Sequence, residues 1–140
     1  MSLAQSSPVS ASPKRAELIA GLRAFLPAEA VLDHEETLRP YECDGLSAYR
    51  QLPLVVALPS TTEQVGQILR LCHRLDIPVV ARGAGTGLSG GSLPLANGLL
   101  LSLAKFNRIL ALDPVNRCAR VQPGVRNLAI SEAAAPFGLY

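Results

Sequence analysis

The sequence is poor in residues that mark several classes of protein. Its three cysteines, Cys43, Cys72 and Cys118, are too few and too widely spaced for a disulfide framework or a CxxC metal site. This usage fits a reducing compartment such as the cytoplasm. The formal net charge is only +2, and no basic cluster is interleaved with aromatic residues, so the sequence gives no sign of a nucleic-acid-binding surface.

Long apolar runs and histidines are also scarce. No stretch reaches the length of a membrane span. Residues 1–13, rich in Ser, Ala and Pro, lack the charged start and apolar core of a secretory signal, and we expect a disordered arm there. The two histidines, His34 and His73, have no base or ligand partner in the sequence, so we expect structural or surface roles for them and neither a catalytic nor a metal site.

Glycine, by contrast, is concentrated in one segment. Five glycines lie within residues 83–92, called here the glycine loop, which directly follows a short apolar run. Glycine allows positive φ angles and close approach of the backbone to a ligand, so several N–H groups of such a loop can face one anion. Thr86, Ser89 and Ser92 add hydroxyl donors, and Arg82 adds a positive charge. The expected ligand is a phosphate or pyrophosphate, and a mobile surface loop is the alternative.

Two common phosphate motifs do not fit the glycine loop. Gly85, Gly87 and Gly90 have the GxGxxG spacing of dinucleotide-binding folds, but that motif opens a helix, which the glycine, proline and asparagine residues that follow here do not favour. The P-loop spacing GxxxxGK[ST] fits from Gly85 to Ser92, but Gly91 stands where the P-loop lysine contacts the phosphates. We therefore reject both motifs.

The apolar pattern predicts an α+β fold with a βαβ unit, in which helices flank a small parallel sheet. Residues 54–58 and 77–81 are apolar runs typical of strands, and the glycine loop begins at the carboxyl end of the second run. Between them, residues 60–62 offer N-cap candidates, and Glu63 lies three residues after the first of these. The helix that follows is expected to bury Val65, Ile68, Leu69, Leu71 or Cys72, and Leu75.

Further elements are predicted on both sides of this unit. The acidic cluster at residues 33–36 is interpreted as a solvated turn. The other predictions are a helix over 14–25, a short strand at 30–32, a third strand over 98–103, a hairpin of 109–113 with 117–121, and a helix over 125–135.

The glycine loop and its flanks carry a family resemblance. Three segments resemble the FAD-binding domain of the vanillyl-alcohol oxidase and p-cresol methylhydroxylase superfamily: PSTTEQV (59–65), RGAGTGLSGGS (82–92) and VQPGV (121–125). Three more are similar to the FAD-linked D subunits of bacterial glycolate oxidases: YECDGLSAYR (41–50), CHRL (72–75) and RVQPGVRNLAIS (120–131). The resemblance covers residues 31–140.

The resemblance implies a domain organisation and a cofactor site. Residues 14–52 would form the first helix and a lead-in segment, and residues 53–140 the first part of a p-cresol methylhydroxylase (PCMH)-type FAD-binding domain, truncated at its C-terminus. Pro59 would lie near the flavin nucleotide, and Gly124 would be required because a side chain there would strike the flavin. The backbone of Arg82, Gly83, Ala84, Gly85, Thr86, Gly87, Leu88, Ser89, Gly90 and Gly91 would wrap the pyrophosphate, and Gln122, Pro123, Gly124 and Val125 would approach the ribityl chain or ring.

One departure from the family pattern concerns the attachment of FAD. Members that bind FAD covalently in this loop carry a histidine at the position aligned with Thr86, and a threonine cannot form that linkage. The resemblance therefore implies non-covalent FAD at this loop.

The implied function is that of the N-terminal FAD-binding portion of a 2-hydroxy-acid oxidoreductase of the glycolate type. In that family a hydride passes from the substrate carbon to FAD, and electrons leave through flavin-like and iron–sulfur partner subunits. A cytoplasmic protein, associated through those partners with the inner face of the membrane, is implied. The alternative is a non-catalytic fragment of 140 residues that does not hold flavin alone and serves only in folding or interaction. The short chain by itself is expected to be inactive.

Overall fold

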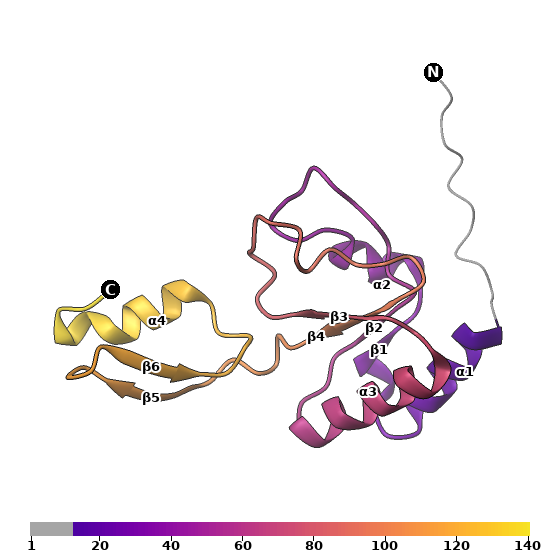
Figure 1. Ribbon diagram of the computed structural model, residues 1–140, viewed down its shortest axis with the longest axis horizontal. Coiled ribbons are helices and arrows are strands. Elements are labelled where there is room, and N and C mark those ends of the chain that lie inside the picture. The colour runs from indigo at the N-terminus through magenta and orange to yellow at the C-terminus, as the bar shows by residue number, and fades with distance from the viewer. Residues whose placement is uncertain (1–12) are drawn as a thin grey trace.

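The computed structural model describes residues 13–140, so the predicted disordered arm lies outside the described residues except for Pro13, which begins the first helix. Figure 1 shows a sheet with helices on both sides and, next to it, a smaller unit formed by the C-terminal part of the chain. In chain order the elements are α1 (Pro13–Arg23), β1 (Val31–Leu32), α2 (Glu35–Leu38), β2 (Val55–Ala57), α3 (Thr62–Leu75), β3 (Val79–Arg82), β4 (Leu99–Ser102), β5 (Ile109–Asp113), β6 (Cys118–Val121) and α4 (Asn127–Ala134). Short 3₁₀ turns lie at Ala28–Ala30, Arg39–Tyr41 and Ala135–Phe137.

The larger sheet has the strand order β1-β2-β4-β3. Both β2 and β3 run parallel to β4, whereas β1 is antiparallel to β2. The predicted βαβ unit is thus present as β2, α3 and β3, with β4 inserted between its strands. Because the three strands are parallel, their carboxyl ends share one edge of the sheet, and the glycine loop leaves β3 at that edge. The predicted α+β fold with a small parallel sheet is confirmed.

The central strand β4 is buried on both faces. Side chains alternate along a strand, so Leu99 and Leu101 pack into one apolar cluster and Leu100 into another. The larger cluster includes residues of α1 and α3, and the smaller one includes Leu38 of α2. Figure 1 accordingly shows α1 and α3 on one side of the sheet and α2 on the other. The prediction of a third apolar strand is confirmed.

The N-cap of α3 is the middle one of the three predicted candidates. Thr61 is the N-cap, and its hydroxyl oxygen accepts the N–H of Gln64 at 3.2 Å. The Gln64 side-chain oxygen in turn accepts the N–H of Ser60 at 2.8 Å, so Glu63 is not the partner that the spacing suggested. The buried face comprises Ile68, Leu71, Cys72 and Leu75. The prediction that Leu69 is buried was wrong. Leu69 follows the buried Ile68 and points away from the buried face, so its side chain is 45% exposed.

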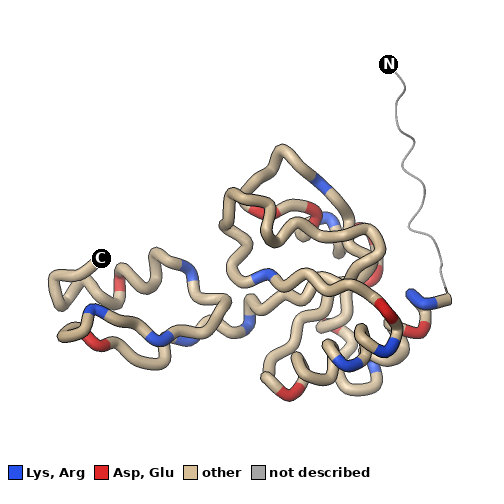
Figure 2. The backbone as a smooth tube through the Cα atoms, viewed as in Figure 1, with Lys and Arg blue, Asp and Glu red and all other residues tan. Residues whose placement is uncertain are grey.

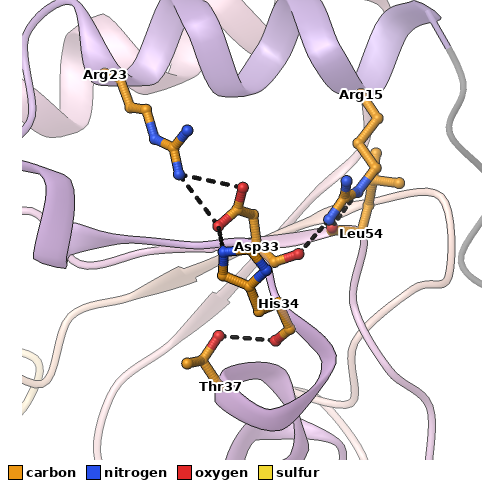
Figure 3. Close-up of polar contacts among 6 residues, drawn as sticks. All are labelled: Arg15, Arg23, Asp33, His34, Thr37 and Leu54. Atoms are coloured by element: carbon orange, nitrogen blue, oxygen red, sulfur yellow. Dashed lines mark hydrogen bonds and ion pairs between the residues drawn. The ribbon is translucent and has the colours of Figure 1, made fainter.

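The segment that precedes β2 is tied to α1 by arginine contacts (Figure 3). Arg23 donates to both carboxylate oxygens of Asp33 at 3.2 Å. Arg15 donates to the carbonyl of Asp33 and, at 3.3 Å, to that of Leu54. The prediction of a solvated turn at residues 33–36 was therefore wrong in part, since Asp33 is paired and α2 begins at Glu35. These contacts tie Asp33 and Leu54 to α1.

Residues 109–140 form a smaller unit, called here the hairpin lobe. Strands β5 and β6 pair antiparallel as predicted, and α4 lies beside them (Figure 1). The turn between them is fixed by Asp113, whose carboxylate accepts the N–H and the side-chain amide of Asn116 at 3.0 and 2.7 Å. These hydrogen bonds lower the pKa of Asp113. None of the residues of α4 is fully buried. Within residues 13–140, no helix has the length and apolarity needed to cross a membrane.

The cysteines provide a test of the packing of α3. Burial raises the pKa of the Cys72 thiol to about 11, whereas Cys118 is exposed on β6. The thiolate is the reactive form, so at pH 8 Ellman's reagent should label Cys118 rapidly and Cys72 only after unfolding. We would compare Cys72→Ser and Cys118→Ser in a Cys43→Ser background, with and without urea. Rapid labelling of Cys72 in the folded protein would contradict the described core.

Candidate functional site

The glycine loop is free of charge and rich in unused backbone donors. Residues 83–104 contain no Lys, Arg, Asp or Glu, and Figure 2 shows this stretch as an uninterrupted tan tube. Among residues 13–140, no N–H of residues 83–91 donates to a backbone carbonyl. Gly85 and Gly90 have φ angles of +73° and +71°, which favour glycine. The loop therefore offers N–H groups, and not side-chain charges, to an anion.

Gly83 brings the glycine loop against the second predicted segment, residues 122–125. A Cβ atom at Gly83 would lie 2.2 Å from the carbonyl oxygen of Pro123, so only glycine allows this approach. The two segments are far apart in the sequence but adjacent in the structure. This backbone contact joins the sheet to the hairpin lobe.

Gly124 is required by the protein itself. A Cβ atom there would lie 2.3 Å from the carbonyl oxygen of Leu103 and 2.9 Å from that of Phe106. The N–H of Gly124 donates to the Phe106 carbonyl at 2.8 Å. The implied reason for this glycine was contact with a flavin, but close packing on the connection between β4 and β5 already explains it. The Gln122 side chain is also engaged, because it accepts the N–H of Arg108 at 3.0 Å.

These two segments border an open hollow of about 350 Å³. Its lining includes Ala84 of the glycine loop and Gly124 and Val125 of the second segment, all predicted site residues. It also includes residues that sequence reasoning missed: Ala104, Asn107, Arg126 and Ala129. Arg126 directly follows a predicted residue, and this adjacency was the available signal. The hollow thus brings one residue of the glycine loop together with one positive charge.

The remaining predicted residues do not line the hollow. Pro59 is fully buried just beyond the carboxyl end of β2, at the same sheet edge as the glycine loop. Thr86, Leu88 and Ser89 are exposed on the loop, and Gly87 and Gly91 face open space. The loop surface beyond the hollow is therefore accessible from solvent.

Arg82 lies under the loop instead of facing solvent. Its side chain is buried, with 7% exposed, and donates to backbone carbonyls. Burial lowers the pKa of its guanidinium, and the negative charge of Asp44 opposes that shift. The Arg82 side chain, which the sequence suggested as a partner for an anion, thus binds carbonyl groups of the protein instead.

The hollow carries no acid–base pair. Among its lining residues, Arg126 alone has an ionisable side chain. His34 and His73 are both exposed and lie outside it. The geometry suits the binding of a large anionic ligand more than proton transfer.

Comparison with known sequences identifies the family of this chain. The family described as FAD binding domain matches residues 53–140, more than half of the chain. Glycolate oxidase subunit GlcD of Escherichia coli is 60% identical over 126 residues, which cover 90% of this chain and 25% of that protein. The chain thus spans about a quarter of the length of this curated relative.

Two solved structures share the fold. That of 4-ethylphenol oxidase from Gulosibacter chungangensis, in complex with isoeugenol, has a TM-score of 0.78 at 29% identity and covers 96% of this chain and 27% of its own. That of p-cresol methylhydroxylase with substrate bound has a TM-score of 0.75 at 25% identity and covers 90% of this chain and 25% of its own. The resemblance seen in the sequence is confirmed: the chain belongs to the FAD-binding domain family, is a homologue of a glycolate oxidase subunit, and has FAD as its cofactor.

Proposed function

We propose that the hollow between the glycine loop and residues 122–126 is where this chain holds FAD. The observation that carries the proposal is the meeting of two distant segments, at Gly83 and Pro123, beside a hollow lined by Ala84, Gly124 and Val125. The unused N–H groups of the loop suit a pyrophosphate, which needs several donors at once. FAD, when bound, would accept a hydride.

Each part of the proposed site has a separate role. The loop backbone binds the pyrophosphate, the open space at Gly87 and Gly91 admits it, and Arg126 adds a positive charge at the border of the hollow. Gln122 acts indirectly, because its hydrogen bond to Arg108 fixes the strand ends that carry residues 123–125. Pro59 is part of the proposed site because it is buried at the sheet edge from which the glycine loop leaves β3.

We propose a 2-hydroxy acid such as glycolate as the substrate class of the whole protein. Support comes from the 60% identity to a protein named glycolate oxidase subunit. The identity is 29% to 4-ethylphenol oxidase and 25% to p-cresol methylhydroxylase. Flavin-like and iron–sulfur partner subunits, and a cytoplasmic location at the inner face of the membrane, belong to the same proposal. So does the division of the chain into a lead-in (14–52) and a flavin-binding part (53–140).

A second candidate function is a non-catalytic module that does not retain flavin by itself. The open form of the hollow and the lack of an acid–base pair among its lining residues favour this candidate for the 140-residue chain. The two candidates differ in one measurable property, which is FAD binding by the isolated chain.

Titration of the chain with FAD, followed by flavin fluorescence, separates the candidates. We expect saturable binding that is lost in Gly85→Val, because a β-branched residue does not tolerate the φ of +73° and its Cβ would lie 3.3 Å from the Arg82 side chain. A folded chain without saturable binding would support the module instead. Equal binding by wild type and Gly85→Val would contradict the assignment of the loop.

The same sample tests how FAD is attached. After precipitation with trichloroacetic acid, the yellow colour should stay in the supernatant, because Thr86 offers no ring nitrogen for a covalent link. Thr86→Ala serves as the matched control and should release flavin equally. Flavin that stays in the washed pellet would contradict non-covalent binding.

A further inference from the structure

Three structural links join the glycine loop to residues 41–46, called here the lead-in wall. The first is Arg82, at the end of β3, whose terminal nitrogen Nη2 donates to the carbonyls of Tyr41 at 3.2 Å and Cys43 at 2.8 Å. The same nitrogen donates to the carbonyl of Ser92, at the far end of the loop, at 3.1 Å. One buried guanidinium therefore holds both the wall and the loop.

The second link is Asp44, which is also buried. Its carboxylate accepts the N–H of Leu46 at 2.9 Å and the hydroxyl of Ser92 at 3.4 Å. These hydrogen bonds lower the pKa of Asp44, so the carboxylate stays charged near Arg82. Both side chains bind Ser92, Arg82 at its carbonyl oxygen and Asp44 at its hydroxyl.

The third link is direct packing of backbone on backbone. A Cβ atom at Gly45 would lie 2.7 Å from the carbonyl oxygen of Gly87 and 2.8 Å from that of Thr86. On the other side, the loop folds over Arg82 itself, because a Cβ at Gly85 would lie 3.3 Å from the Arg82 Cδ. The loop thus lies between the lead-in wall and the aliphatic part of the Arg82 side chain.

We propose that Arg82 is a positioning residue that fixes the glycine loop against the lead-in wall, and that this wall is a required part of the FAD site. The inference rests on the proposed function. It extends the site to residues 41–46, which precede the family match that begins at residue 53. Arg82 does not touch the ligand: its Nη2 is shared by three carbonyls, and its Nε is buried without a partner among residues 13–140.

Two variants test the proposal from opposite sides of the junction. Arg82→Lys keeps the charge but loses the planar group that holds three acceptors, and Gly45→Ala leaves Arg82 intact while forcing the wall away from the loop. Gly66→Ala on α3 is the control, since the nearest atom to its Cβ is the flexible end of Arg70 at 3.4 Å. Circular dichroism and urea unfolding identify the folded variants.

Two readouts are measured on the full chain. Without FAD, amide hydrogen exchange in peptides covering 83–92 should rise in Arg82→Lys and Gly45→Ala but not in Gly66→Ala. With FAD, each of the two variants should bind at least about tenfold more weakly than wild type. Arg82→Lys loses hydrogen bonds from a charged group, and Gly45→Ala displaces the wall from the loop. If Arg82→Lys fails to fold, Gly45→Ala still decides both readouts.

The outcomes separate this inference from the proposed function. Unchanged loop exchange and wild-type FAD affinity in folded Gly45→Ala and Arg82→Lys would overturn the positioning role. Increased loop exchange, in a chain whose wild type binds no FAD, would support the positioning role and reject flavin binding by the isolated chain. A direct charge role for Arg82 predicts near-normal affinity in Arg82→Lys, and that result would also overturn the proposal.

Discussion

Alanine in place of Gly83 should abolish measurable FAD binding and destabilise the fold. The added Cβ would lie 2.2 Å from the Pro123 carbonyl oxygen, and neither the Cβ, which is fixed by the backbone, nor the carbonyl oxygen can rotate away. The glycine loop and residues 122–125 must therefore separate, which opens the hollow. We expect the free energy of unfolding to fall by about 1–3 kcal/mol, in the range of overpacked sites. Urea unfolding and an FAD titration measure the two effects.

A second loop glycine provides the control for Gly83→Ala. A Cβ atom at Gly91 would have no other atom within 4 Å, and the φ of Gly91 is not positive. Gly91→Ala should therefore leave the free energy of unfolding within about 0.5 kcal/mol of wild type. Gly83→Ala with wild-type FAD affinity and stability would refute the contact that joins the two segments. Equal losses in the two variants would point to a general sensitivity of the loop.

Truncation of Leu99 to alanine should give the largest loss of stability. Leu99 is fully buried in the central strand β4 and packs into the larger cluster with α1 and α3. Leucine-to-alanine changes at such sites lower the free energy of unfolding by about 2–5 kcal/mol. That is a large fraction of the total of about 5–15 kcal/mol typical of a domain. The midpoint of urea unfolding should shift strongly, with an unchanged slope.

The matched control for this core variant is Leu69→Ala on α3. Leu69 is 45% exposed, so its removal should change the free energy of unfolding by only about 0.5 kcal/mol. A Leu99→Ala protein as stable as Leu69→Ala would show that β4 does not occupy the centre of the sheet.

Local sequence patterns predicted most of the elements. Continuous apolar runs identified β2, β3 and β4, and helical spacing identified α1 and α3, because burial imposes these periods directly. The sequence left three chemically equivalent N-cap candidates for α3, Ser60, Thr61 and Thr62, and the structure has Thr61. The burial of Leu69 was misjudged, because neighbouring apolar residues on a helix do not reveal which of them faces the sheet.

The site was only partly predictable. The density of glycines indicated an anion-binding loop, and the family resemblance supplied FAD. The approach of Gly83 to Pro123 depends on tertiary placement of the hairpin lobe, which no local pattern encodes. Asn107 and Arg126 were missed for the same reason. Gly124 was predicted as a site residue but with a different reason, because its close neighbours Leu103 and Phe106 come from another connection.

The all-leucine core of β4 has a consequence for folding specificity. A one-residue slip would exchange the faces of Leu99, Leu100 and Leu101, and apolarity alone would scarcely oppose it. Register must come from the strand ends, where Leu99 N–H binds the Pro78 carbonyl at 2.9 Å and Leu103 N–H binds that of Arg82 at 2.7 Å. The second of these bonds belongs to the junction that shapes the ligand loop. The hydrogen bond between Leu103 and Arg82 therefore contributes both to the register of β4 and to the position of the glycine loop. A substitution that disturbs it should affect both.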